Sequence, residues 1–394
     1  MENSSLVEVP VGLLKVGMYV AEVDRPWLET PFSTQGFTIE SEADIDFIAE
    51  HCEYVYVDQQ NRRHNGLTTP RFQPVERKAP SRSLKMTLQT AKVDFESASV
   101  AMERVFAELK RNRRVNLPQV QAAVEPLIKG VINNGEALSA LMRMREKSDY
   151  FHEHAISTAV WAIILARHMG YDKDELKPLA LGATLIDTGM INVPDHVLNK
   201  GDSLSTEELR LVRSHVRASV RMAEEAGVVD HRIIEIIACH HERHSGSGYP
   251  KKLSGADIPI NARIVSIADV YDAMVTDRPH ASALTSYAAI KELNRLAGAF
   301  FNPALVSAFT QVVGLFPTGA IVHLSSGEVG IVTAQNPLRR LHPEVLLILN
   351  ANKEPYEKHV SLNLAKQKPE SAQVSIVEEL TPGSYGVEAE HYFL

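Results

Sequence analysis

The sequence has little cysteine and no long hydrophobic run, and each shortage excludes a class of protein. Only two cysteines occur among 394 residues, Cys52 and Cys239, which excludes a disulfide framework and indicates a reducing compartment. No apolar run approaches the roughly 20 residues of a membrane helix. The polar start, residues 1–5, is unlike a signal peptide. These observations predict a cytoplasmic protein that does not enter a membrane.

An excess of positive charge is also lacking. The 41 Lys and Arg are outnumbered by 49 Asp and Glu, which gives a formal net charge of −8. A nucleic-acid-binding surface needs clustered Lys and Arg, so we expect no nucleic-acid partner. A small nucleotide remains compatible with this charge.

Local patterns divide the chain into four segments. Residues 1–58 alternate short apolar and polar pieces between Gly and Pro, which predicts a β-rich module. Residues 59–85 hold seven Lys or Arg, one acid and three Pro, a composition that favours a solvated linker over a phosphate-binding arm. Residues 86–316 follow helical periodicity, and residues 317–394 return to short strands. The predicted fold class is multidomain α+β, with a mainly helical domain between two small β-rich modules.

The helical segment begins with an apolar stripe over residues 86–111. Its members follow spacings of three and four in strict turn: Leu88, Ala91, Phe95, Ala98, Met102, Val105 and Leu109. This spacing is a heptad seam. It is compatible with a homodimer through this helix, or with packing of the same stripe onto the following helices, and the sequence does not choose between them.

Residues 240–250 are the most distinctive stretch: two adjacent histidines run into a glycine-rich turn that ends in Tyr249-Pro250. Adjacent side chains on a helix point about 100° apart, which suits two ligands of a shared metal centre. The glycines let the backbone pass close to a ligand. For the pair alone, surface histidines are an equal alternative. Other imidazoles and carboxylates favour a metal cluster: His154, Asp187, His215 and Asp269.

Several short motifs occur in a fixed order after residue 239: His240-His241-Glu242, Gly246-Ser247-Gly248-Tyr249-Pro250, Ile258-Pro259, Ala262-Arg263-Ile264, Ile267-Ala268-Asp269-Val270-Tyr271-Asp272-Ala273 and Arg278-Pro279. With them, residues from about 145 to 315 resemble the HD-GYP domains, a branch of the HD phosphohydrolases that cleave the bacterial second messenger cyclic di-GMP. Residues 1–58 resemble the small module of unassigned role that precedes some HD-GYP domains, and residues 317–394 resemble the C-terminal extension of such proteins.

The resemblance implies a centre of divalent iron or manganese, with one or two ions per chain. The implied metal ligands are His154, Asp187, His215, His240, His241 and Asp269. Asp187 would bridge two ions and act as the catalytic carboxylate. One half-site would consist of Asp187 and the three later histidines, and the other of His154, Asp187 and Asp269. Tyr249 and Arg278 would bind the substrate, cyclic di-GMP or its linear product pGpG.

The chain departs from the family pattern at this centre. Ile186 stands where the family has the histidine of its His-Asp doublet, and Met190 stands where it has a lysine. Ser245 replaces an aspartate, and Ala281 occupies a position that is basic in some members. Tyr150 replaces a glutamate of trinuclear members, so a third metal is not expected. Of the two nearby histidines that could replace the missing ligand, His244 is a better candidate than His152.

Two functions from different classes follow. The favoured interpretation is an HD-GYP homologue with a degenerate metal site, weakly active or inactive, that acts in cyclic di-GMP signalling by binding the nucleotide or protein partners. The alternative is a functioning metal-dependent phosphodiesterase that hydrolyses cyclic di-GMP to pGpG or GMP. A purely structural helical module is disfavoured, because buried ligands without a partner are costly.

Overall fold

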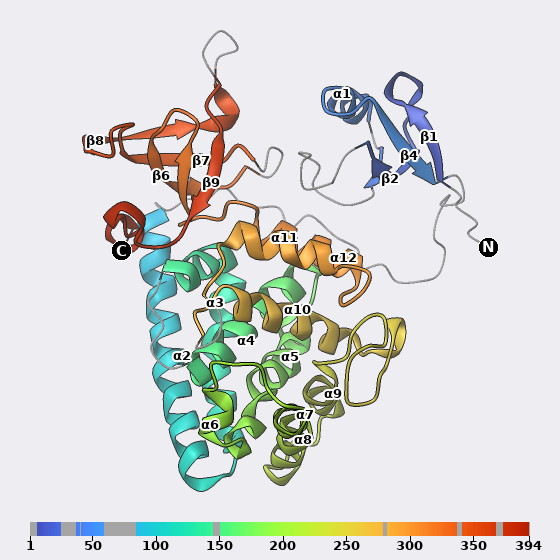
Figure 1. Cartoon of the computed structure of the whole chain (residues 1–394), viewed down its shortest axis with the longest axis vertical. Coiled ribbons are helices and arrows are strands. Elements are labelled where there is room, and N and C mark those ends of the chain that lie inside the picture. Colours follow the sequence, from blue (N-terminus) through green and yellow to red (C-terminus); the bar gives the residue numbers. More distant parts are fainter. Residues whose placement is uncertain are drawn as a thin grey trace.

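The structure is a computed structural model that describes residues 6–24, 37–39, 41–58, 84–144, 150–278, 282–336, 341–367 and 373–393. A helical body carries a C-terminal sheet, orange to red in Figure 1, and the N-terminal module is a separate small sheet drawn in blue. This arrangement confirms the predicted α+β fold class. Most of the predicted linker lies outside the described residues, and the predicted domain boundaries stay predictions.

The N-terminal module is a four-stranded antiparallel sheet in the order β1-β4-β2-β3. Its elements are β1 (Leu6–Pro10), β2 (Tyr19–Val23), β3 (Phe37–Thr38), α1 (Glu42–Ala49) and β4 (Tyr54–Asp58). Ser41 and Asp44 form a capping box that begins α1. Val20, Ile39 and Val55 are buried in a core of the module's own, as the alternating sequence pattern predicts.

Two long helices, α2 (Leu84–Asn112) and α3 (Leu117–Met144), lie along one side of the helical body. They pack against each other, and every member of the heptad stripe is buried within the single chain. The second of the two interpretations of this stripe therefore applies. A homodimer through helix 86–111 stays a prediction.

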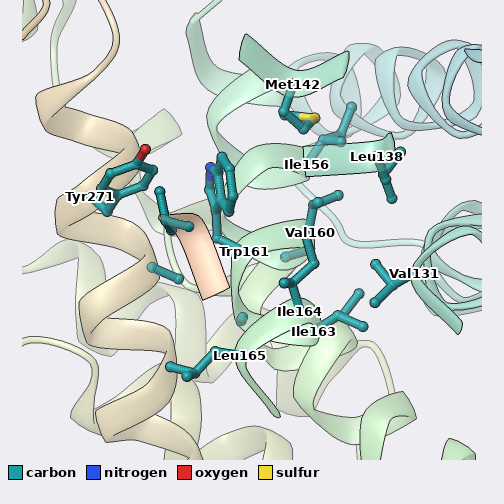
Figure 2. Packing of buried hydrophobic residues seen from close by; sticks show 14 of the residues in the cluster. Val131, Leu138, Met142, Ile156, Val160, Trp161, Ile163, Ile164, Leu165 and Tyr271 are labelled. Atoms are coloured by element: carbon teal, nitrogen blue, oxygen red, sulfur yellow. The ribbon is translucent and has the colours of Figure 1, made fainter. Parts of the chain in front are cut away.

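The rest of the body surrounds α4 (Tyr150–His168), whose residues from Ala155 to Ala166 are all buried. Figure 2 shows Trp161 of α4 facing Tyr271 of α10 (Ile260–Met274), and their ring centroids are 5.1 Å apart. The other helices that position the site are α5 (Lys173–Leu185), α7 (Thr206–Arg213), α8 (His215–Glu225) and α9 (His231–Cys239). Helices α5 and α10 contact α4, and α9 packs against both of them. The relative positions of these helices are therefore fixed by packing.

The C-terminal module is a five-stranded antiparallel sheet in the order β8-β7-β6-β5-β9. Its strands are β5 (Ile321–Leu324), β6 (Val329–Ala334), β7 (Glu344–Leu349), β8 (Pro355–Asn363) and β9 (Ile376–Leu380). The sheet shares one hydrophobic core with the helices. Glu379 of β9 accepts a 2.6 Å hydrogen bond from the amide of Tyr287, in the first turn of α11 (Ser286–Leu296). The sheet is thus part of the body that holds the site.

Within the described ranges, no helix combines the length and the apolar character needed to cross a membrane.

Candidate metal centre

Five helices bring the predicted ligands together, four of them at or near an end. His154 lies near the start of α4, and Asp187 follows α5 by two residues. His215 is the first residue of α8, and His240 and His241 directly follow α9. Asp269 lies within α10. All six predicted ligand positions therefore belong to one region of the helical body.

A glycine explains how Asp187 reaches His215. Asp187 is followed by a short 3-10 helix, η3 (Thr188–Asn192), which packs against α8. A Cβ atom added at Gly189 would overlap the carbonyl oxygen of His215 and the amide nitrogen of Ser219. The amide of Gly189 also donates a 2.8 Å hydrogen bond to Ser219 Oγ. Only glycine permits this approach without displacement of α8.

The first group of potential ligands, called here the complete half, consists of Asp187, His215, His240 and His241. One ligand atom from each lies within 4.8 Å of the others. Asp187 Oδ1 is 3.2 Å from His215 Nε2 and 3.9 Å from His240 Nε2. His215 and His240 are fully buried as side chains. The donor set of three imidazoles and one carboxylate suits a divalent transition metal.

Hydrogen bonds at the other ring nitrogens fix how these imidazoles face the centre. His215 Nδ1 donates to the carbonyl of Val212 at 2.6 Å, and His240 Nδ1 donates to that of Ile237 at 2.8 Å. In these tautomers both Nε2 atoms carry lone pairs, yet they lie only 3.4 Å apart. Asp187 Oδ1 beside them is buried and has no hydrogen-bond donor among the described groups. Acceptors that converge in this way fit a bound cation.

The pKa values of the four potential ligands are set by their burial and by their charged neighbours. Burial alone would raise the pKa of Asp187, but the imidazoles of His215, His240 and His154 outweigh it and hold this pKa well below its usual range. Burial also acts to lower the pKa of His215, and the adjacent Asp187 carboxylate raises it overall. For His240 and His241, burial dominates and lowers the pKa. These two rings are therefore neutral near pH 7, the form that binds a metal.

The second group, called here the incomplete half, consists of His154, Asp187 and Asp269. His154 Nε2 is 3.0 Å from Asp269 Oδ1 and 3.8 Å from Asp187 Oδ2. On its other side, His154 Nδ1 is 2.7 Å from Asp272 Oδ2. Asp272 was not among the predicted site residues. Asp272 follows Asp269 by three residues, which places both carboxylates on one face of α10. This spacing could have identified Asp272 as a site residue.

The position that would complete this half is apolar. Ile186 is 1 % exposed and belongs to the hydrophobic core, so it offers no ligand atom. The replacement suggested at His244 is not found among the described groups that could hold a metal. The amide of His244 instead donates to the carbonyl of Phe300 at 2.9 Å. His152 is absent from the same groups.

The glycine-rich turn packs closely against the segment that carries His240 and His241. Glu242 is buried, and its carboxylate accepts hydrogen bonds from the amides of Lys251 at 2.7 Å and Leu253 at 3.0 Å. A Cβ atom at Gly248 would lie 2.5 Å from Arg243 N and from His241 O. Glu242 therefore has a structural role in the motif, which sequence reasoning did not assign.

This turn presents Tyr249 to the centre. The Tyr249 ring stacks on His241 with centroids 4.7 Å apart and an interplanar angle of 27°. Burial raises the pKa of Tyr249 well above its usual range, so its hydroxyl stays protonated and can donate a hydrogen bond. The guanidinium carbon of Arg213 lies 5.0 Å from the same ring. Arg213 was also missed, because α7 gives no sign in sequence of its approach to Tyr249.

The remaining predicted positions lie at the edge of the site. Arg278 is exposed just beyond α10, and no hydrogen bond or ion pair joins it to the cluster within the part of the chain that is described. Ser245 is exposed, and its hydroxyl lies 3.0 Å from that of Ser247. Met190 is half-buried in η3. Ala281 lies outside the described residues.

Comparison with known proteins identifies the class. A model of the HD domain family matches residues 135–305, and a model of a domain of unknown function (DUF3391) matches residues 6–120. HD domains are metal-dependent, in accord with the cluster of imidazoles and carboxylates. The second match extends past β4 and through α2.

Several relatives show which HD domain proteins this chain is like in sequence. A cyclic di-GMP phosphodiesterase of Pseudomonas aeruginosa is 29 % identical over 88 % of this chain and 86 % of its own length. The response regulator RpfG of Xanthomonas campestris, also a cyclic di-GMP phosphodiesterase, is 34 % identical over 40 % of this chain and 44 % of its own. A 3'3'-cGAMP-specific phosphodiesterase of Vibrio cholerae is 34 % identical over 40 % of this chain and 30 % of its own. The chain therefore carries an HD domain and is similar to cyclic di-GMP phosphodiesterases, in accord with the HD-GYP resemblance of its motifs.

Among solved structures, an HDGYP protein from Bdellovibrio bacteriovorus aligns with a TM-score of 0.49 and 20 % identity, over 78 % of this chain and 99 % of that one.

Proposed function

We propose that this chain is an HD-GYP homologue that binds one divalent metal and a cyclic dinucleotide, and hydrolyses the nucleotide weakly or not at all. The observation that carries the proposal is the contrast at Asp187. On one side three imidazoles converge on its carboxylate, and on the other side the adjacent Ile186 is buried in the hydrophobic core. Such a protein would act in cyclic di-GMP signalling by binding the nucleotide or a protein partner.

The complete half would hold the metal through Asp187, His215, His240 and His241. Iron or manganese is the proposed metal, since mixed imidazole and carboxylate ligands suit such divalent ions. A bound divalent ion supplies positive charge that neutralises a phosphodiester group. The hydrogen bonds from His215 and His240 to backbone carbonyls support this assignment, because they direct both Nε2 atoms inward.

Recognition of the nucleotide is assigned to the mouth of the site. Tyr249 has a protonated hydroxyl beside His241 and can donate to a phosphate or a base. Arg278 is exposed, and a guanidinium can bind two phosphate oxygens at once. The relatives named as phosphodiesterases of cyclic di-GMP and 3'3'-cGAMP support a cyclic dinucleotide as the ligand class.

Weak catalysis is assigned to the incomplete half. Loss of even an outer hydrogen-bond partner of a metal ligand costs roughly 10- to 100-fold in metal affinity, so loss of a ligand itself at Ile186 costs more. Met190 offers no charge to the reacting phosphate, and removal of one donor to a transition state typically costs about 10²- to 10³-fold in rate. Together these two changes oppose efficient turnover.

A functioning phosphodiesterase is the second candidate. It is favoured by the close approach of His154, Asp187 and Asp269, which leaves three possible ligands for a second ion. The phosphodiesterase activity named for the relatives favours it as well.

Measurement of hydrolysis and binding on the same preparation distinguishes the nucleotide-binding homologue from the functioning phosphodiesterase. The chain, supplied with Mn²⁺ or with Fe²⁺ under anaerobic conditions, is incubated with cyclic di-GMP and with 3'3'-cGAMP, and binding is followed by calorimetry. We expect a binding isotherm with at least one nucleotide and little product. Turnover in the range of about 1 to 10³ per second that enzymes typically reach would favour the second candidate. No heat with either nucleotide would overturn both.

A further inference from the structure

Arg213 is an exposed cation in contact with the candidate site. It is the last residue of α7 and precedes the potential ligand His215 by two positions. Its guanidinium carbon lies 5.0 Å from the centroid of the Tyr249 ring. The same ring stacks on His241 at 4.7 Å. Arg213 is thus connected to the complete half through one aromatic ring.

A second cation close to the two adjacent histidines is already engaged. Arg243 donates from Nη1 to the carbonyls of His240 at 3.0 Å and Glu242 at 3.1 Å, and to Ser266 Oγ at 2.7 Å. Within the described ranges, Arg213 has neither a carboxylate partner nor a hydrogen-bond acceptor. Its charge is therefore available to a ligand.

The contact with Tyr249 is not a hydrogen bond to an acceptor, so N–H groups of Arg213 stay available to a ligand. A guanidinium carries five N–H donors in one plane. That planar edge matches the spacing of two phosphate oxygens. A ring contact of this kind also restricts the long side chain before the ligand arrives, which reduces the entropy lost on binding.

We propose that Arg213 binds the non-bridging phosphate oxygens of the cyclic dinucleotide. The inference rests on the proposed function, and it assigns to Arg213 the cationic contact with the phosphodiester that Met190, on the neighbouring η3, cannot make. Tyr249 then has two tasks: it contacts the ligand through its hydroxyl and holds Arg213 at the mouth of the site.

Calorimetry of cyclic di-GMP binding to the full chain, loaded with Mn²⁺, tests the proposal. Arg213→Ala removes the side chain. Arg213→Met keeps an apolar stem that can rest on Tyr249 but removes the charge, and Arg213→Lys keeps the charge without the planar edge. Arg221, exposed on α8 six residues beyond His215, is the matched control and is changed to Ala. Melting temperatures and Mn²⁺ content are measured for every variant.

The expected result is a dissociation constant raised about tenfold or more in Arg213→Ala and Arg213→Met alike, in line with the strength of charge-assisted hydrogen bonds. Arg213→Lys should lie between these variants and the wild type, and Arg221→Ala should stay within about twofold of it. The wild type should also lose more affinity than Arg213→Met as salt is added, because a screened charge contributes less.

Three outcomes would overturn the inference. Wild-type affinity in Arg213→Ala would remove any role in binding and would leave the proposed function standing. Wild-type affinity in Arg213→Met, with a loss only in Arg213→Ala, would show that Arg213 only supports the Tyr249 ring. Absence of binding by the wild-type chain itself would overturn the proposed function together with the inference.

Discussion

The two halves of the candidate centre share Asp187 but differ in what surrounds it. In the complete half, three imidazoles converge on Asp187, and two of them are oriented by backbone carbonyls. In the incomplete half, only His154 and Asp269 join Asp187, and the adjacent Ile186 is buried in the hydrophobic core. A change at a single position thus separates two sites that are built on the same buried helices.

If the proposed function holds, this difference shows how a site can forgo a second ion and keep its fold. Ile186 extends the buried apolar run at the end of α5, so the substitution fits the core that holds the helices together. The orientation of His154 is retained through Asp272. The packing that positions a site and the ligands that fill it are therefore separable, and the substitutions below use this separation.

The largest effect is expected from restoring the incomplete half. Ile186→His adds the missing imidazole, and Met190→Lys adds a cation near the reacting phosphate. Each change alone should do little, because the lysine requires the second metal and the second metal still faces an uncompensated phosphate. The double variant should hydrolyse cyclic di-GMP about 10²- to 10³-fold faster than either single variant. Product formation by chromatography gives the rates, and the two single variants are the controls.

The repair carries a structural cost that must be controlled. A histidine in the core at position 186, without a metal, would destabilise the fold by about 1 to 3 kcal/mol, so metal is supplied during folding. A double variant that stays folded and takes up a second metal, yet fails to cleave the nucleotide, would show that Ser245, position 281 or access to the site limits catalysis instead.

The second largest expected effect is on Mn²⁺ affinity, and it distinguishes the two halves directly. His215→Ala removes a ligand of the complete half and should weaken Mn²⁺ binding by more than about 100-fold, since the loss of an outer partner alone reaches that range. His154→Ala removes a ligand of the incomplete half and should leave the affinity for the first ion within a few-fold of the wild type. Titration with Mn²⁺ monitored by electron paramagnetic resonance measures both. Equal losses in the two variants would mean that one ion uses ligands from both halves.

The smallest expected effect is the loss of affinity for the second ion when Asp272 is changed. Its carboxylate lies 2.7 Å from His154 Nδ1 and orients the ring. In the chain carrying Ile186→His and Met190→Lys, the further change Asp272→Asn should weaken the second ion by roughly 10-fold and the first hardly at all. Asp257→Asn, at an exposed carboxylate, serves as the control. If both ions weaken equally, Asp272 supports the fold of the site rather than one half of it.

Much of the architecture could be predicted from the sequence because it depends on local pattern. The alternation in residues 1–58 predicted a small sheet, and the motif from His240 to Pro250 predicted a turn beside paired imidazoles. The heptad stripe predicted burial, but it did not choose the surface that covers it. A stripe of that width packs equally well on a second chain or on α3, and only the tertiary contacts decide.

The missed residues depend on contacts between distant elements. Arg213 and Tyr249 come together because α7 and the glycine-rich turn meet at the site, which neither stretch signals locally. His244 was a reasonable replacement ligand from its spacing to His241. Its backbone instead pairs with Phe300, far along the chain. Asp272 was within reach of sequence reasoning, because its helical spacing from Asp269 places both carboxylates on one face.

Metal content is the most direct test of the difference between the halves. The unaltered chain is purified without chelators, supplied with excess Mn²⁺ or Fe²⁺, passed through a desalting column and assayed by elemental analysis against protein concentration. The account predicts one tightly held ion per chain, and none in His215→Ala. Two tightly held ions per unaltered chain would contradict it, because the incomplete half would then bind metal without the ligand missing at Ile186.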